Sequence, residues 1–144
     1  MHNRPTHEQR ATSRRRVLVA EDDFELRRLI VSALTTDGFD VSEVRDGGQL
    51  LRTIASNAAN GSPQPSLVIT DVRMPGMTGL EALEALRSLL AQTAVVVISA
   101  FPDANTRREA MRLGAIGVLD KPFSLDDLRM IALNSEHWPF SRRS

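Results

Sequence analysis

The sequence predicts a doubly wound α/β fold, in which a five-stranded parallel sheet is covered by helices on both faces. Two observations predict it. Five short apolar stretches alternate with five longer stretches whose apolar residues recur at helical spacing. The central short stretches are apolar throughout rather than at every second residue, which is typical of parallel strands buried on both faces. Strands that alternate with helices in this way form parallel sheets through right-handed crossovers.

Residues that end helices support this division of the chain. Asp23 suits the N-cap of the stretch at 24–36 and Gly38 its C-terminal end. Thr78 suits the N-cap of the third helical stretch, and Gly114 closes the fourth. We expect strands at residues 16–20, 39–44, 67–71, 93–99 and 116–119. We expect helices at residues 24–36, 46–60, 80–90, 103–113 and 124–133.

The length of 144 residues fits a single domain, which we expect at residues 16–135. Residues 1–15 are polar and rich in arginine, and we interpret them as a flexible basic tail. Residues 136–144 are expected to form a short C-terminal tail, too short for a second domain. The 18 basic and 18 acidic residues leave no net charge that would attract nucleic acid or membranes.

The composition also bears on the compartment. The sequence contains no cysteine, which excludes disulfides and thiolate sites and fits a reducing environment. The longest apolar run, residues 94–101, is too short to span a bilayer. We therefore expect a cytoplasmic protein with no membrane partner. Binding of nucleic acid through the arginines at 14–16 and 142–143 is a less favoured alternative, because no helix-turn-helix or aromatic platform accompanies them.

The most informative stretch is Leu67–Asp71, an apolar strand that runs directly into a carboxylate. Pro75 and Gly76 then force a loop. Asp71 is therefore expected at the carboxyl end of a central strand, where open α/β sheets hold their ligands. Taken alone, such an aspartate is more often only the last residue of a strand, so the interpretation depends on which other residues lie near it.

Chemically active side chains end or follow other strands as well. Asp22 and Asp23 follow the first strand, Ser99 closes the fourth, and Lys121 follows the fifth. In a doubly wound sheet these strand ends meet with Asp71 at one crevice. Carboxylates brought so close repel one another, and oxygen ligands with few protein donors favour Mg²⁺ as the neutralising cation.

Lys121 is the only lysine among the 18 basic residues, which suggests a site that needs a compact ammonium group. Lys121 offers a charge to an anion, Ser99 a hydroxyl donor, and Ala100 is small enough to let a substituent approach the backbone. Together these residues predict a site where Asp71 accepts a phosphoryl group as an acyl phosphate.

This set of residues resembles the receiver domain of two-component response regulators over about residues 15–135. The resemblance rests on Glu21-Asp22-Asp23, on Asp71 with Met74-Pro75-Gly76, on Ser99-Ala100 and on Lys121-Pro122-Phe123. It implies a flavodoxin-like (βα)5 fold with strand order 2-1-3-4-5. It also implies a phosphoacceptor protein rather than an enzyme, with only self-catalysed phosphotransfer and slow loss of the phosphoryl group.

The resemblance further implies roles for single residues. Asp71 would be phosphorylated by a histidine kinase or a histidine phosphotransfer protein, with Ser99 and Lys121 as its catalytic partners. Mg²⁺ would be held by Asp22, Asp23, Asp71 and the backbone carbonyl of Arg73. The phosphoryl oxygens would be contacted by Ser99, Ala100, Lys121 and Arg73. The Lys121–Pro122 peptide bond would be cis.

One position departs from the family pattern. Receivers often carry an aromatic residue three positions before the lysine, where this chain has Val118, so this part of the switch would be absent or muted. Without an effector domain, output would be a contact with an unknown downstream protein through residues 103–113, 116–119 and 124–133. Receivers also use this face for homodimers, so a monomer or weak homodimer is expected. The alternative is a constitutive interaction module that keeps the fold and has lost switching.

Overall fold

The computed structural model describes residues 15–100 and 103–137. Five parallel strands form one sheet in the order β2-β1-β3-β4-β5, so the predicted fold class and strand order are confirmed. The strands are β1 (Arg16–Ala20), β2 (Asp40–Val44), β3 (Leu67–Asp71), β4 (Ala94–Ser99) and β5 (Ala115–Asp120). The helices are α2 (Phe24–Thr36), α3 (Gly47–Asn60), α4 (Gly79–Ala85), α5 (Ala104–Arg112) and α6 (Leu125–Asn134), followed by the 3-10 turn η1 (Ser135–His137).

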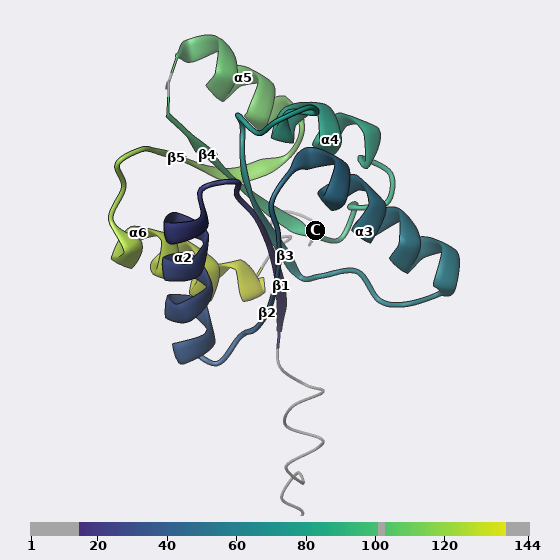
Figure 1. Cartoon of the computed structure of the whole chain (residues 1–144), viewed down its shortest axis with the longest axis horizontal. Coiled ribbons are helices and arrows are strands. Elements are labelled where there is room, and N and C mark those ends of the chain that lie inside the picture. Colours follow the sequence, from purple (N-terminus) through teal and green to yellow (C-terminus); the bar gives the residue numbers. More distant parts are fainter. Residues whose placement is uncertain (1–14, 101–102, 138–144) are drawn as a thin grey trace, which may run out of the picture.

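The sheet carries a hydrophobic core on each face. Helices α2 and α6 cover one face, and α3, α4 and α5 cover the other (Figure 1). Side chains alternate between the two cores along a strand: Val17 and Val19 of β1 pack under α2 and α6, whereas Leu18 and Ala20 face the other three helices. Every residue of β3 and β4 is buried, as the unbroken apolar runs predict, and β2 and β5 are the partly exposed edges.

The third helix is shorter than its leucine spacing predicts. Its expected range is 80–90, but α4 ends at Ala85 and residues 86–92 form turns. The amide of Leu89 donates to the carbonyl of Leu86, three residues earlier, at 2.9 Å, whereas an α-helical hydrogen bond spans four residues. Leu86 and Leu90 are both buried while Leu89 is 38% exposed, so turns satisfy the core without a further helical turn.

The described chain is tied together near its two ends. Arg15, which the sequence assigns to the flexible tail, donates from Nη1 to Ser135 Oγ at 2.8 Å and from Nη2 to the Ser135 carbonyl at 3.2 Å. Arg16 donates to the carbonyls of Pro63 and Gln64. Two arginines of the basic segment thus serve the fold, and the remaining tail residues, 1–14 and 138–144, lie outside the described residues. Among the described helices, none has the length and apolar character needed to cross a membrane.

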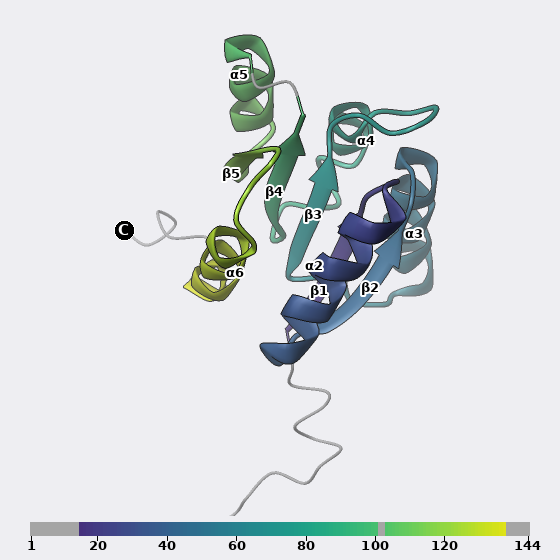
Figure 2. The same ribbon diagram turned by 60° about the vertical axis from the view of Figure 1, so that its left-hand side comes forward.

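All five strands point the same way, so their carboxyl ends lie at one edge of the sheet (Figure 2). The loops that follow β1, β3 and β5 leave from this edge and carry most of the acidic and basic residues singled out in the sequence. A ligand-binding or reactive site is therefore expected at this edge of the sheet.

Candidate functional site

Asp71 is the last residue of β3, and it is 2% exposed. The strand is held on both sides, by β1 and by β4, so the Asp71 backbone has little freedom. Its Oδ1 accepts a hydrogen bond from the Arg73 amide at 2.9 Å, and its Oδ2 contacts the Lys121 ammonium group. One carboxylate oxygen is thus oriented by the following loop and the other by a cation.

Gly79 lets helix α4 begin directly against Asp71. A Cβ atom at this position would collide with the Asp71 carbonyl oxygen and would lie 2.8 Å from Thr70 Oγ1. Thr78 caps the helix, accepting from the Glu81 amide at 3.1 Å, while the Glu81 carboxylate accepts from the Thr78 amide at 2.9 Å. The capped, close-packed start of α4 therefore holds the C-terminal end of the loop that follows Asp71.

Lys121 reaches Asp71 from the loop after β5. Its amide donates to the Ser99 carbonyl at 2.7 Å, which joins the ends of β4 and β5. Burial opposes its charge, but the carboxylates of Asp71 and Glu21 outweigh burial and raise the pKa of Lys121. The side chain is therefore a stable ammonium group, as an anion-binding role requires. Ser99 is buried at the end of β4, and the Lys121–Pro122 peptide bond is cis.

Glu21 is the site residue whose role the sequence argument did not single out. Its side chain is fully buried, and its Oε2 accepts from the Asp23 amide at 3.0 Å. Its Oε1 lies 3.1 Å from Lys121 Nζ, yet among the described residues it has no donor in hydrogen-bonding geometry. Burial, reinforced by the hydrogen bond with Asp71, raises the pKa of Glu21 to about 7.

Three carboxylates form a compact cluster at this edge. Oxygen atoms of Glu21, Asp22 and Asp71 all lie within 4.8 Å of one another. Asp23 does a different job, because its side chain accepts from the Leu26 amide at 3.1 Å and caps α2. Of the predicted ligands Asp22, Asp23 and Asp71, the structure brings Asp22 and Asp71 together, with Glu21 beside them in place of Asp23. The metal-binding role of these residues stays a prediction.

The cluster fits Mg²⁺ chemically. Its donors are all carboxylate oxygens, one of them a buried atom without a hydrogen-bond donor among the described residues, and Asp22 is exposed to solvent. Mg²⁺ prefers such oxygen ligands and keeps several waters. The ligand role of the Arg73 carbonyl stays a prediction.

The other predicted residues surround this centre. Ala100 is exposed beside Ser99, and Arg73 is exposed in the loop after β3. The bond from the Thr106 amide, helped by the charge of Arg73, lowers the pKa of Asp103 at the N-cap of α5. Val118 is half-buried on β5, paired with Val97 and packed against the core under α3, α4 and α5.

A hollow of about 440 Å³ adjoins the Lys121 side of the cluster. It lies between the start of α2 and the loop after β5, and most of its lining is apolar side chain. Leu29 on its α2 side is 55% exposed. Its lining residues are Asp23, Glu25, Leu26, Leu29, Ala100, Lys121, Pro122 and Phe123.

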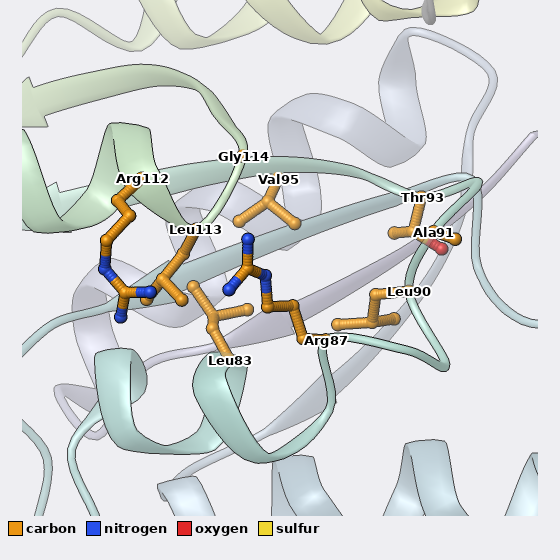
Figure 3. Close-up of a pocket in the computed structure, with 9 residues that line it drawn as sticks. All are labelled: Leu83, Arg87, Leu90, Ala91, Thr93, Val95, Arg112, Leu113 and Gly114. Atoms are coloured by element: carbon orange, nitrogen blue, oxygen red, sulfur yellow. The ribbon is translucent and has the colours of Figure 1, made fainter.

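A second hollow, of about 190 Å³, lies at the opposite edge of the sheet, near Thr93 and Val95 at the start of β4 (Figure 3). Arg87 extends its side chain into it, and Arg112 lies at its α5 side (Figure 3). Arg112 pairs with Glu84 and with Glu109, and Glu84 also lies 3.9 Å from Arg87, so two carboxylates balance the two guanidinium groups. None of its lining residues belongs to the Glu21–Asp22–Asp71 cluster, so the candidate functional site is the end of the sheet that carries Asp71.

Comparison with known proteins agrees with this geometry. Residues 17–132 match the family model of the response regulator receiver domain. The regulatory protein AtoC of Escherichia coli is 33% identical over 120 residues, which are 83% of this chain and 25% of AtoC. The response regulator MprA of a Mycobacterium species is 35% identical over 120 residues, 82% of this chain and 50% of MprA. The chain thus spans a quarter to a half of the length of these curated relatives.

Solved structures extend the agreement to three dimensions. The chemotaxis response regulator CheY4 of Vibrio cholerae superposes with a TM-score of 0.72 at 26% identity, over 85% of this chain and 99% of CheY4. Residues 17–132, which match the family model, contain all of the sheet except Arg16 and include Glu21, Asp71, Ser99 and Lys121. The chain therefore belongs to the response regulator receiver domain family, whose members are phosphoacceptor signalling modules.

Proposed function

We propose that Asp71 accepts a phosphoryl group from a histidine kinase or histidine phosphotransfer protein, and that the added charge controls a protein–protein contact. One observation carries the proposal: the buried Asp71 carboxylate contacts the Lys121 ammonium group and also belongs to a cluster with the carboxylates of Glu21 and Asp22. A structural carboxylate would need only the cation. The further carboxylates are costly unless a metal ion joins them, and phosphoryl transfer is the chemistry that uses such an ion.

The residues divide the chemistry between them. An Asp71 carboxylate oxygen bonds to phosphorus while the bond from phosphorus to the donor nitrogen breaks, and the leaving histidine keeps the electron pair. The Arg73 amide, bonded to Oδ1, orients the nucleophile. Lys121, now in contact with Asp71 Oδ2, neutralises charge on the phosphoryl oxygens, and the Ser99 hydroxyl and the backbone at Ala100 donate to them.

Glu21, Asp22 and Asp71 would hold Mg²⁺, and the bound ion would neutralise charge on the transferring group. Asp23 remains the cap of α2 in this scheme. We expect the domain to transfer a phosphoryl group only to itself and to lose it slowly to water.

The hollow beside Lys121 suits the phosphodonor. A donor histidine must approach Asp71 past Ala100 and Lys121, and the apolar side chains of Leu29 and Phe123 flank that path. Leu29→Glu is expected to slow phosphotransfer from a protein donor while leaving phosphorylation by acetyl phosphate within about twofold, since Leu29 does not touch the reacting atoms. Equal slowing with both donors would contradict this role for the hollow.

The decisive experiment is Mg²⁺-dependent phosphorylation by acetyl phosphate, followed by mass spectrometry of the intact chain. We expect one phosphoryl group on the wild type and none on Asp71→Asn. Asp126→Asn, an exposed aspartate on α6, is the matched control and should be phosphorylated normally. Failure to modify the wild type, or equal modification of Asp71→Asn, would refute the proposal.

We expect the downstream protein to bind the face formed by α5, β5 and α6. We expect the protein itself to be a monomer or a weak homodimer. Pull-down of partners with the phosphorylated and Asp71→Asn forms tests it, with phosphorylation-dependent capture as the expected result.

Val118 favours one alternative, a constitutive interaction module with little switching. The Val118 side chain is half-buried, packs against the core, and has no aromatic ring that could move inward on phosphorylation. NMR spectra with and without beryllofluoride and Mg²⁺ separate the two functions. Shifts that reach α5 and α6 support the switch, and shifts confined to the cluster support the constitutive module.

A further inference from the structure

Arg27 is a buried arginine that neither the phosphoryl chemistry nor the metal site uses directly. It lies on the first turns of α2 and is 9% exposed. Its Nη1 donates to the backbone carbonyl of Glu21 at 2.7 Å, and its Nε donates to Glu43 Oε1 at 2.8 Å. The guanidinium therefore joins the acidic loop after β1 to the edge strand β2.

The hydrogen bond from Arg27 to the Glu21 carbonyl helps to hold the Glu21 backbone in place. The Glu21 amide donates to the Val44 carbonyl of β2 at 3.1 Å, so β2 and Arg27 hold the two sides of the same residue. The Glu21 carboxylate accepts from the Asp23 amide through Oε2, and its other oxygen, Oε1, lies 3.1 Å from Lys121 Nζ in the site. A shift of the Glu21 backbone would move this oxygen with it.

The Arg27 side chain is itself locked in place. Glu43 accepts from both Arg27 and Arg28, and the Arg27 guanidinium carbon lies 5.4 Å from the centre of the Phe24 ring. A charge-assisted bond from such a preorganised group is directional as well as strong. The arrangement is that of an outer residue that orients a metal ligand, here through the ligand's main chain.

We infer that Arg27, supported by Glu43, is a positioning residue that sets the Mg²⁺ affinity of the Glu21–Asp22–Asp71 cluster. The inference rests on the proposed function, because it assigns a further residue to the same site. Arg27 touches neither phosphoryl group nor metal. Its loss therefore weakens metal binding and leaves the chemical step at saturating Mg²⁺ nearly unchanged.

The test compares Arg27→Gln, Arg27→Lys and Glu43→Gln with the wild type. Arg129→Gln is the control, because Arg129 also makes charge-assisted hydrogen bonds, to both oxygens of Asp37 at 2.7 and 2.8 Å, on a different part of the fold. Three quantities are measured: the Mg²⁺ dissociation constant by calorimetry, urea unfolding, and amide exchange of Glu21 and Asp23 without Mg²⁺.

We expect Arg27→Gln to weaken Mg²⁺ binding about tenfold, and Arg27→Lys and Glu43→Gln to weaken it about threefold, as outer ligand-orienting groups do. The Glu21 and Asp23 amides should exchange faster in these variants than in Arg129→Gln at matched stability. Arg129→Gln should lower stability and leave Mg²⁺ affinity within about twofold. At saturating Mg²⁺ the phosphorylation rate of Arg27→Lys should match the wild type within about threefold.

Mg²⁺ affinity in Arg27→Lys and Glu43→Gln that stays within twofold of the wild type would overturn the inference, and would leave Arg27 a purely structural residue. These milder variants decide the matter even where Arg27→Gln does not fold. If the wild type binds Mg²⁺ and is phosphorylated on Asp71 while the variants bind equally well, only this inference fails. If the wild type binds no Mg²⁺, the proposed function and the inference fail together.

Discussion

At the scale of a single residue, Glu21 would make the proposed metal binding depend on pH. Burial, with the hydrogen bond to Asp71, raises the pKa of its carboxyl group to about 7, so near neutral pH about half of the metal-free molecules carry a proton there. A cation requires the ionised form, so binding releases this proton. Mg²⁺ affinity therefore rises with pH and levels off above the raised pKa.

We expect Mg²⁺ affinity to increase about tenfold from pH 6 to pH 8, because the ionised fraction of such a group rises by that factor. Calorimetry in buffers of different ionisation enthalpy measures the affinity and the released proton together. Glu21→Gln should bind weakly and lose the pH dependence, whereas Glu109→Gln on α5 should behave as the wild type. Equal affinity at both pH values would show that Glu21 is not a ligand.

At the scale of an element, the position where α4 begins depends on the close packing of Gly79 against Asp71 rather than on helix propensity. Gly79→Ala places a Cβ against the Asp71 carbonyl, so the helix or the strand end must move. We expect a loss of about 1–3 kcal/mol in unfolding free energy, the usual cost of overpacking. Phosphorylation of the folded protein should also slow, because Asp71 is displaced.

Gly117→Ala on β5 is the matched control for this substitution. A Cβ there would meet Ile131 at 3.5 Å, an ordinary contact. Urea unfolding and the acetyl phosphate reaction measure both effects. A Gly79→Ala protein as stable and as reactive as Gly117→Ala would contradict the close approach.

The ion pair between Arg129 and Asp37 is a feature of the whole molecule, since it joins α6 to the turn after α2 across 92 residues of sequence. The hydrogen bonds from Arg129 lower the pKa of Asp37. A carboxyl group with a lowered pKa contributes stability above its unfolded pKa and loses it as pH falls through the folded value. We expect Asp37→Asn to cost about 1 kcal/mol at pH 7 and nothing in strong acid.

Asp126→Asn is the control for that pair, because Asp126 contacts the same arginine from an exposed position. It should change the unfolding free energy by less than about 0.5 kcal/mol at pH 7. Urea titrations at several pH values measure both. A cost of Asp37→Asn that persists in strong acid would assign it to packing instead.

Mg²⁺ should also stabilise the whole fold, since it binds a cluster that exists only in the folded chain. At a hundredfold excess over its dissociation constant, a ligand of the folded state adds about 2.7 kcal/mol. Thermal unfolding should shift upward with Mg²⁺ and return on addition of a chelator. Sodium chloride at equal ionic strength is the control, and an equal shift with it would point to general screening.

The sequence alone determined the sheet, the helices that cover it, and the strand ends that bring Asp71, Ser99 and Lys121 together, because apolar periodicity and turn residues are local signals. For the metal site it favoured Asp23 over the neighbouring acid Glu21. The choice between the two depends on the start of α2, where Asp23 caps the helix and its amide turns the Glu21 carboxylate into the site. The early end of α4 and the reach of Arg27 to Glu21 and Glu43 were likewise decided by tertiary packing, since each joins residues whose proximity no local pattern encodes.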